Sequence, residues 1–264
     1  MSRLPRIMLT APSSGSGKTT VTCAILQALV GRGMKPVSFK SGPDHIDPMF
    51  HTEVIGAKSA NLDLFFMNEN TTRHLMRENG KDRDIAIIEG AMGYYDGIAM
   101  GADASAYSLM LASETPAVLV IDARGQALSA AALVKGFAGF RTDSGICGVI
   151  LNRISSTLYP RFKACIEAET GMRVYGFLPE EPECVIESRH LGLVTAGEIS
   201  DLKQKLNLLA QRAEETIDIN GLIALSKAAP EIAECEITLP KPVAGNPKMQ
   251  SRVIKRSAFI VRIR

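Results

Sequence analysis

Residues 11–20 read APSSGSGKTT and follow directly on an apolar run, RIMLT, at residues 6–10. A helical pattern begins inside the same stretch and extends over residues 18–31. A glycine-rich loop between a strand and a helix, ending in Gly-Lys-Thr, is the pattern of a phosphate-binding P-loop. Ala11 stands where the usual pattern has its first glycine, a position that needs a small residue more than it needs glycine. The stretch predicts nucleotide binding, and a Gly/Ser-rich turn that only caps a helix is the alternative.

Each residue type in this loop has a physical reason. Glycines let backbone N–H groups close around phosphate oxygens, and a helix N-terminus attracts anions. Lys18 supplies a cation to the β and γ phosphates, and the Thr19 hydroxyl can ligate Mg²⁺. We therefore expect ATP and Mg²⁺ as cofactors. The residues expected to contact nucleotide are Ser14, Gly15, Ser16, Gly17, Lys18, Thr19, Thr20 and Asn152.

The order of apolar and helical patterns predicts an α/β fold. Short, nearly continuous apolar runs, typical of buried strands, lie at 6–10, 35–40, 85–89, 117–122, 146–151 and 173–178. Helical patterns lie between or after them at 18–31, 70–79, 104–113, 126–140 and 157–169. This alternation predicts a doubly wound, mostly parallel sheet covered by helices on both faces. Two more helices are expected at 201–215 and 220–229, after the sheet is complete.

An acidic stretch, KSGPDHIDPMFH at residues 40–51, follows the second expected strand. The carboxyl ends of strands in such a sheet open into the binding crevice. Asp44 and Asp47 lie between prolines in what we expect to be a rigid loop, and paired carboxylates suit Mg²⁺. An Asx-type turn with solvated carboxylates is an equal alternative. His45 and His51 belong to the same loop and are expected to touch substrate.

The stretch IEGAMGYYDG at residues 88–97 ends the third expected strand with a carboxylate. Glu89 should emerge beside the P-loop and hold Mg²⁺ directly or through water, with Thr19 and Asp47 as the other metal ligands. A strand-end carboxylate bonded to a backbone amide is the alternative. Glycines 90, 93 and 97 are expected to let the loop pass close to substrate, with Asp96 as a further polar group.

Polar residues that could belong to the site also lie at the ends of two later strands. Asn152 ends the fifth expected strand, beside Arg153, where its amide could recognise adenine, although a turn-forming Asn is as good an interpretation. Asp122 follows the fourth strand, and helix capping accounts for it nearly as well as a place in the crevice.

The composition is that of an ordinary globular protein, with 46% hydrophobic and 22% charged residues. The net charge of +2 comes from 30 basic and 28 acidic side chains, so the basic footprint of a nucleic-acid binder is missing. Five dispersed cysteines without a CxxC pair indicate reduced thiols. No signal peptide or membrane-length apolar stretch is evident, so we expect a cytoplasmic protein without a membrane partner.

The C-terminal part differs in composition from the sequence before it. Residues 236–250 include three prolines and are expected to form a linker. The last 14 residues, SRVIKRSAFIVRIR, carry five basic side chains and a strand-like run at 258–263. We place one large domain before the linker, at residues 1–235.

Seven motifs in order resemble the cobyrinic acid a,c-diamide synthase family. They are APSSGSGKTT, KSGPDHIDP, IEGAMGYYDG, VIDARGQALSAAALVKGF, LNR, GFLPE and SRHLGLVTAGE, and they cover about residues 6–200. The resemblance implies a P-loop fold of the dethiobiotin synthetase-like type. It also implies that residues 251–264 are the truncated start of a glutamine amidotransferase-like domain whose glutaminase cysteine and histidine are absent here.

The resemblance further implies the activity. ATP would phosphorylate the a and c acetate side chains of a corrin-type macrocycle, and ammonia, free or from glutamine, would displace each phosphate. Carried over by motif, Lys18, Asp44, Asp47, Glu89 and Asp96 would be the catalytic residues. Two alternatives stay open: a nickel-sirohydrochlorin a,c-diamide synthase, and a P-loop ATPase switch of the partitioning or metal-delivery type. Such switches usually carry a second lysine early in the loop, where this sequence has Pro12, Ser13 and Ser14. A homodimer is one expected assembly.

Overall fold

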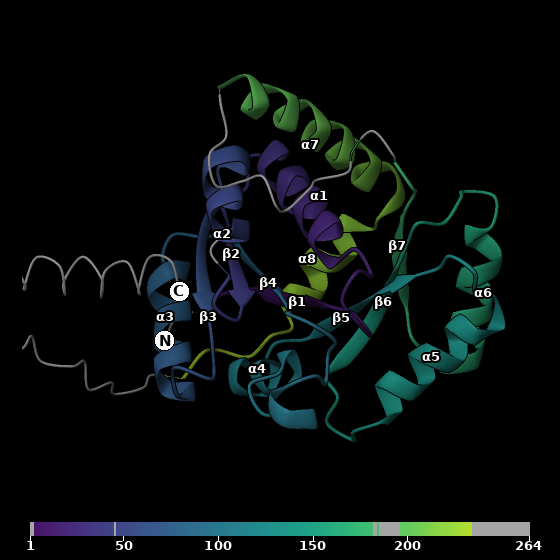
Figure 1. Ribbon diagram of the computed structural model, residues 1–264, viewed down its shortest axis with the longest axis horizontal. Coiled ribbons are helices and arrows are strands. Elements are labelled where there is room, and N and C mark those ends of the chain that lie inside the picture. The colour runs from purple at the N-terminus through teal and green to yellow at the C-terminus, as the bar shows by residue number, and fades with distance from the viewer. Residues whose placement is uncertain (1–2, 45, 182–183, 185–195, 234–264) are drawn as a thin grey trace, which may run out of the picture.

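The computed structural model describes residues 3–44, 46–181, 184 and 196–233 (Figure 1). Within them seven strands form one parallel sheet in the order β3-β2-β4-β1-β5-β6-β7. The strands are β1 (Arg6–Thr10), β2 (Pro36–Ser41), β3 (Lys58–Leu62), β4 (Ile85–Glu89), β5 (Ala117–Asp122), β6 (Ile146–Asn152) and β7 (Val174–Leu178). The predicted doubly wound parallel sheet is confirmed.

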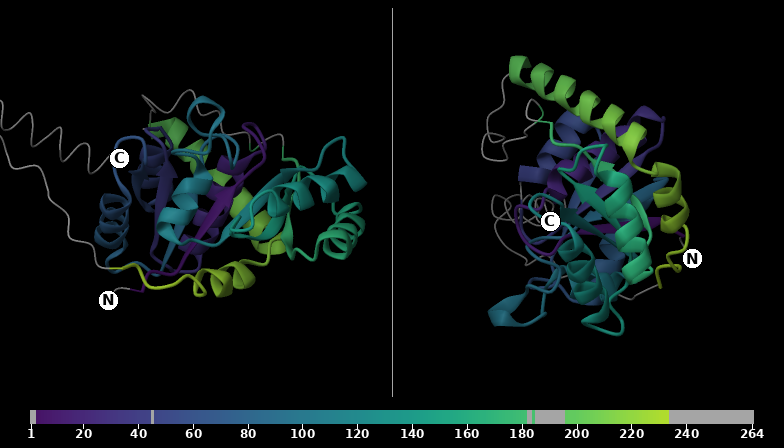
Figure 2. Two further views of the ribbon diagram at one scale, coloured as in Figure 1. Left: turned by 90° about the horizontal axis from the view of Figure 1, so that it is seen from below. Right: turned by 90° about the vertical axis from the view of Figure 1, so that its right-hand side faces the viewer.

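Helices cover both faces of this sheet (Figures 1 and 2). The α-helices are α1 (Lys18–Gly31), α2 (Ile46–Phe50), α3 (Glu69–Gly80), α4 (Ala106–Ser113), α5 (Leu128–Gly139), α6 (Tyr159–Thr170), α7 (Ala196–Thr216) and α8 (Ile219–Ser226). A π-helical turn, η1 (His51–Ile55), and a 3₁₀ turn, η2 (Ile98–Met100), complete the elements. The predicted linker at 236–250 and the segment 251–264 lie outside the described residues.

The strands are apolar on both faces because each face supports a separate core. In β1, Ile7 and Leu9 pack in the core with α1, η1, α7 and α8, whereas Met8 packs in the core with α3, α4, α5 and α6. Successive side chains of a strand point to opposite faces, so a central strand buried on both sides needs a continuous apolar run. This explains why these strands could be predicted from the sequence to within one or two residues.

Four elements were not predicted: β3, α2, η1 and η2. The strand β3 reads KSANL, in which only Ala60 and Leu62 reach the apolar core. Residues 46–55, which the sequence placed in a rigid loop, form α2 and η1. Pro48 does not prevent this helix because it lies in the first turn, where a missing N–H costs no hydrogen bond. Asp47 is therefore a helical residue, and the expectation of an acidic loop over residues 40–51 is wrong beyond residue 45.

The register of the sheet puts polar side chains of three neighbouring strands in one row. Lys40 at the end of β2 pairs with Glu89 of β4 on one side and with Asn61 of β3 on the other. The P-loop leaves the end of β1, and β1 has β4 and β5 as its two neighbours. Ligands of open α/β sheets bind where the strand order reverses in this way.

The outer edge of β7 is covered by the connection between α7 and α8. The Asp218 N–H donates to the carbonyl of Tyr175 at 2.6 Å, and the Thr216 hydroxyl donates to the carbonyl of Phe177. Gly176 lies between them with a φ of +136°, and a Cβ at this residue would be 2.2 Å from the carbonyl oxygen of Thr216. Only glycine permits so close an approach of the two chains.

Candidate functional site

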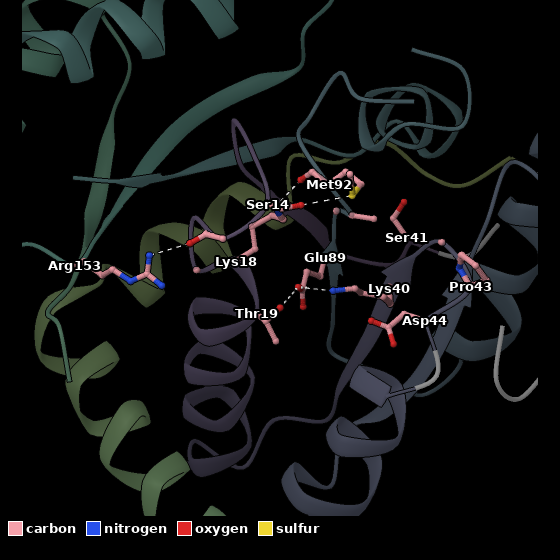
Figure 3. A pocket seen from close by; sticks show the side chains of 15 residues that line it. Ser14, Lys18, Thr19, Lys40, Ser41, Pro43, Asp44, Glu89, Met92 and Arg153 are labelled. Carbon is pink, nitrogen blue, oxygen red and sulfur yellow. Dashed lines mark hydrogen bonds and ion pairs between the residues drawn. The ribbon is translucent and has the colours of Figure 1, made fainter. Parts of the chain in front are cut away.

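A cavity of about 380 Å³ opens at the carboxyl ends of β1, β2 and β4 (Figure 3). Its wall is made by the P-loop, by the turn that follows β2 and by the turn that follows β4. Of the residues predicted to contact nucleotide, those that line it are Ser14, Gly15, Gly17, Lys18 and Thr19. Ser16 and Thr20 belong to the same segment but do not line the cavity. The predicted loop and the predicted crevice therefore coincide.

The P-loop presents backbone donors to this cavity. Gly15 and Gly17 have φ values of +80° and +90°, the left-handed region that side chains disfavour. Gly17 is the N-cap of α1, and no side chain caps the first turn of this helix. The first N–H groups of α1 are thus left for a ligand, and an anion at a helix N-terminus also gains from the helix dipole.

Lys18 bridges the two sides of the P-loop cavity. Its Nζ donates to the carbonyl of Ser13 at 3.1 Å and to that of Met92, in the turn after β4, at 2.6 Å. Burial lowers the pKa of Lys18, and the nearby Glu89 opposes this shift. Two neutral carbonyls compensate a buried ammonium only in part, so a phosphate in the cavity would be a stronger partner for Lys18.

A buried charge cluster forms the opposite wall. Glu89 is fully buried, and its Oε1 accepts from the Thr19 hydroxyl and from Lys40 Nζ, each at 2.6 Å (Figure 3). Lys40 Nζ also lies 2.6 Å from Asp47 Oδ2. The predicted metal ligands are therefore brought together, Thr19 and Glu89 by a direct hydrogen bond and Asp47 through Lys40.

The electrostatics of this cluster follow from burial and pairing. Burial favours the neutral form of Lys40, but attraction to Glu89 and Asp47 outweighs it and raises the Lys40 pKa. Burial likewise disfavours the Glu89 carboxylate, but Lys40 outweighs it and lowers the Glu89 pKa. Pairing thus favours the charged forms of Lys40 and Glu89.

The oxygen donors in this cluster fit a magnesium ion. Glu89 Oε2 is buried and has no hydrogen-bond partner among the described residues. A buried carboxylate oxygen without a partner is costly, and a hard cation would satisfy it. No group of three or more His, Cys, Asp or Glu in the described part of the chain makes a complete metal cage. Mg²⁺ does not need one, because it usually takes one or two carboxylates together with waters and substrate phosphates.

The two other predicted acids lie in different settings. Asp44 lines the cavity from the turn after β2. Asp96 is exposed, does not line the cavity, and its Oδ2 accepts from the Gly93 N–H at 3.1 Å. Asp44 is thus in reach of a ligand in the cavity, whereas Asp96 stabilises the turn after β4.

The glycines of this turn allow close approaches within the protein. A Cβ at Gly93 would be 2.5 Å from the carbonyl oxygen of Pro12, and one at Gly97 would be 2.2 Å from that of Asp103. The Tyr94 N–H donates to the carbonyl of Ala11 at 2.9 Å. The turn after β4 is therefore packed against the P-loop, which positions Met92 over Lys18.

Residues at the end of β6 support the P-loop from below. Asn152 is buried, and its Nδ2 donates to the carbonyl of Ser16 at 3.0 Å. Arg153 lines the cavity, and its Nη1 donates to the carbonyl of Gly15 and to Asp122 Oδ2. Asp122 does not cap α5, whose N-cap is Ala127 without a side-chain cap. It acts instead as the anion that holds Arg153.

The predicted contact of His51 with substrate is wrong. His51 is fully buried beneath the site, because it lies on the inner face of η1 rather than in a loop. His45 lies outside the described residues.

Sequence reasoning missed Lys40 and Asn61. Asn61 is fully buried, and its Nδ2 donates to the carbonyls of Gly42 and Asp44, which fixes the turn after β2. The one signal available for Lys40 was its position: a lysine that ends an apolar strand directly before an acidic stretch.

A P-loop after the central strand of a parallel sheet, with a lysine and a buried carboxylate facing it, defines the P-loop NTPase class. The described helices include none that is long and apolar enough to cross a membrane. The chain belongs to the family described as the CobQ/CobB/MinD/ParA nucleotide binding domain, whose family model matches residues 7–193.

Curated relatives are similar over most of this chain. The cobyrinate a,c-diamide synthase of Listeria monocytogenes serotype 4b (strain F2365) is 38% identical over 230 residues, which are 86% of this chain and 51% of that protein. The hydrogenobyrinate a,c-diamide synthase of Mesorhizobium japonicum is 41% identical over 222 residues, 83% of this chain and 51% of that protein. The chain thus spans about half the length of the curated relatives it matches. The resemblance predicted from the motifs is confirmed.

Solved structures share the fold. The cell division protein MinD of Aquifex aeolicus superposes with a TM-score of 0.52 at 17% identity, covering 85% of this chain and 96% of its own. The chloroplast FtsY of Physcomitrella patens gives a TM-score of 0.53 at 14% identity, covering 78% of this chain and 66% of its own. At such identities the likeness concerns the fold alone.

Proposed function

We propose that this chain carries the ATP-dependent half of a corrin a,c-diamide synthase. It would phosphorylate the a and c acetate carboxylates of cobyrinic acid and let ammonia displace each phosphate. The observation that carries this proposal is the cavity itself, which is lined by Lys18 of the P-loop and by the ion pair of Lys40 and Glu89. Asp47 does not line the cavity but pairs with Lys40 from behind. The names of the relatives supply the substrate class.

The charged groups of this cavity suit the phosphorylation of a carboxylate. A carboxylate is a poor acyl donor until its oxygen is phosphorylated, so the enzyme must bring two anions together. The ammonium groups of Lys18 and Lys40 lie on opposite walls of one cavity and can offset that repulsion. Holding the carboxylate in line and stabilising charge on the transferring phosphoryl group account for most catalysis of this kind. No protein nucleophile is required.

The metal ligands in this proposal are Thr19, Glu89 and Asp47. Mg²⁺ bound there would neutralise charge on the nucleotide phosphates. With Glu89 and Asp47 engaged in this way, Lys40 would be free to turn toward the reacting carboxylate. Asp44 would orient substrate from the turn after β2.

The source of nitrogen is assigned to a separate unit. We propose that residues 1–235 are the synthetase domain, that residues 236–250 are a linker and that residues 251–264 belong to a glutamine amidotransferase-like unit. Burial raises the pKa of the Cys23 thiol well above its ordinary value, so this cysteine is unsuited to act as a nucleophile. A cytoplasmic location and a homodimer remain predictions.

The proposal is tested by comparing nitrogen donors. We expect the purified chain, given ATP, Mg²⁺ and cobyrinic acid, to form the a,c-diamide with ammonium above neutral pH, where more NH₃ is present. We expect no product with glutamine, and mass spectrometry of the product checks both results. Amidation of nickel-sirohydrochlorin in preference would redirect the proposal to that tetrapyrrole. ATP hydrolysis that responds to a protein partner and to no macrocycle would contradict it in favour of an ATPase switch.

A second prediction concerns magnesium. We expect Glu89→Gln and Asp47→Asn to weaken the Mg²⁺ dependence of the reaction more than they weaken nucleotide affinity, because each removes a charged oxygen donor next to the phosphates. Higher Mg²⁺ should partly restore both variants. Titrations of activity with Mg²⁺ and of nucleotide binding without it measure the two effects. Glu78→Gln, an exposed acid of α3, is the control, and an unchanged Mg²⁺ requirement in both site variants would remove them from the metal site.

A further inference from the structure

Three buried polar side chains form a second layer beneath the charge cluster. His51 Nδ1 lies 2.9 Å from the hydroxyl oxygen of Ser38, and His51 Nε2 lies 3.6 Å from the sulfur of Cys23. All three residues are fully buried. The layer therefore joins η1, β2 and α1, which carry this histidine, serine and cysteine respectively.

The periodicity of α1, β2 and the helical residues 46–55 places the second layer directly beneath the charge cluster. Side chains four apart on a helix, or two apart on a strand, share a face. The corresponding pairs are Cys23 with Thr19, Ser38 with Lys40, and His51 with Asp47. Contacts that fix the three residues of the second layer relative to one another therefore also fix the three residues with which they are paired.

Asp47 needs such a support more than the other residues do. It belongs to α2, which has only five residues before the chain enters the π-helical turn η1 at His51. A helix this short is not stable by itself, and π-helical turns are frequent at functional sites. In η1, Val54 and Ile55 add apolar contacts with the core, but His51 makes its polar contacts with β2 and α1.

We propose that His51 is a positioning residue, which holds α2 against β2 and α1 so that the Asp47 carboxylate reaches Lys40. The inference rests on the proposed function only for its kinetic readout. A neutral imidazole suits this place because one ring nitrogen donates and the other accepts, so that both can be satisfied by Ser38 and Cys23. Burial lowers the His51 pKa, which keeps a further cation away from the cluster. Replacing the ring by an apolar side chain would leave the Ser38 hydroxyl buried without this partner.

The test uses two substitutions of His51. His51→Leu fills the space but makes no hydrogen bond, whereas His51→Asn keeps a polar atom near the place of Nδ1 and hence the bond to Ser38. For His51→Leu we expect the gain in ATPγS affinity that Mg²⁺ produces, measured by calorimetry, to fall roughly tenfold, as is typical when a supporting partner of a metal ligand is lost. We expect affinity without Mg²⁺ to stay within about threefold of the parent. In amidation assays kcat should fall by a similar factor with little change in KM, and His51→Asn should recover most of both losses.

A matched control and two outcomes complete the design. His74→Asn changes a partly exposed histidine of α3, away from the cavity, and should leave both readouts unchanged. If His51→Leu lowers the melting temperature but leaves the Mg²⁺ effect and kcat at parent values, His51 is a packing residue and the inference is overturned. If the parent chain amidates no macrocycle, the proposed function fails, and the Mg²⁺ effect on ATPγS affinity still decides the role of His51.

Discussion

Replacement of Lys18 by alanine is expected to lower the rate of ATP-dependent amidation by about 10²-fold or more, because loss of one charge-stabilising donor costs about 3–4 kcal/mol in the transition state. The structure supports so large an effect. Lys18 is buried at the P-loop, and within the described part of the chain its hydrogen-bond partners are two carbonyls, so its charge is available to a phosphate. The rate is measured from diamide formed at saturating ATP and ammonium.

The control for this variant is Lys35→Ala, which removes an exposed lysine ahead of β2. It should keep the parent rate. Since Lys18 also ties Ser13 to Met92, the melting temperature of Lys18→Ala must be recorded, and the comparison is valid while both proteins remain folded at the assay temperature. If a folded Lys18→Ala protein kept an activity within a few-fold of the parent, the assignment of the P-loop as the catalytic centre would be wrong.

The substitution Lys40→Met is expected to reduce both stability and activity. It leaves the carboxylates of Glu89 and Asp47 buried without their cation, and breaking a buried ion pair in this way typically costs about 3–5 kcal/mol of unfolding free energy. Amidation should fall as well, because one of the two cations of the cavity is gone. Urea unfolding and product formation measure the two losses.

The pH dependence of stability should differ in sign between parent and variant. In the parent the Glu89 pKa is lowered, so Glu89 stabilises the fold above its unfolded pKa, and this contribution is lost as the pH falls through the folded pKa. Without Lys40, burial raises the Glu89 pKa, and the deficit of Lys40→Met should shrink on acidification. Adding Glu89→Gln and Asp47→Asn to Lys40→Met should restore stability without activity. An equal deficit at pH 7 and pH 5 would show that the three side chains are not coupled.

The parts of the fold that were predicted correctly share a physical property. A central strand such as β4, IAIIE, is buried on both faces and must be apolar throughout, so its limits can be read from composition. The edge strand β3 could not be recognised from an apolar run, because Ser59 and Asn61 alternate with Ala60 and Leu62. The helix α2 could not be recognised either, since five residues are too few to show a helical period.

The residues of the site likewise divide into those that a local sequence pattern predicts and those whose role depends on tertiary structure. The P-loop residues could be placed because a glycine-rich loop between strand and helix is a local pattern. The role of Lys40 depends on the register of β2 against β4, which no spacing in the sequence reveals. The burial of His51 depends on which face of η1 meets α1, so the expectation that it touches substrate rested on its neighbours in sequence alone.

The covered edge of β7 decides where this protein can associate with other chains. A strand that joins a sheet does so by bonding to outward carbonyls and N–H groups, which is the route to domain swapping and to amyloid-like growth. At β7 the carbonyls of Tyr175 and Phe177 already accept hydrogen bonds from Asp218 and Thr216. An incoming β-segment would first have to displace this connection. The β7 side of the sheet is thereby protected against templated polymerisation.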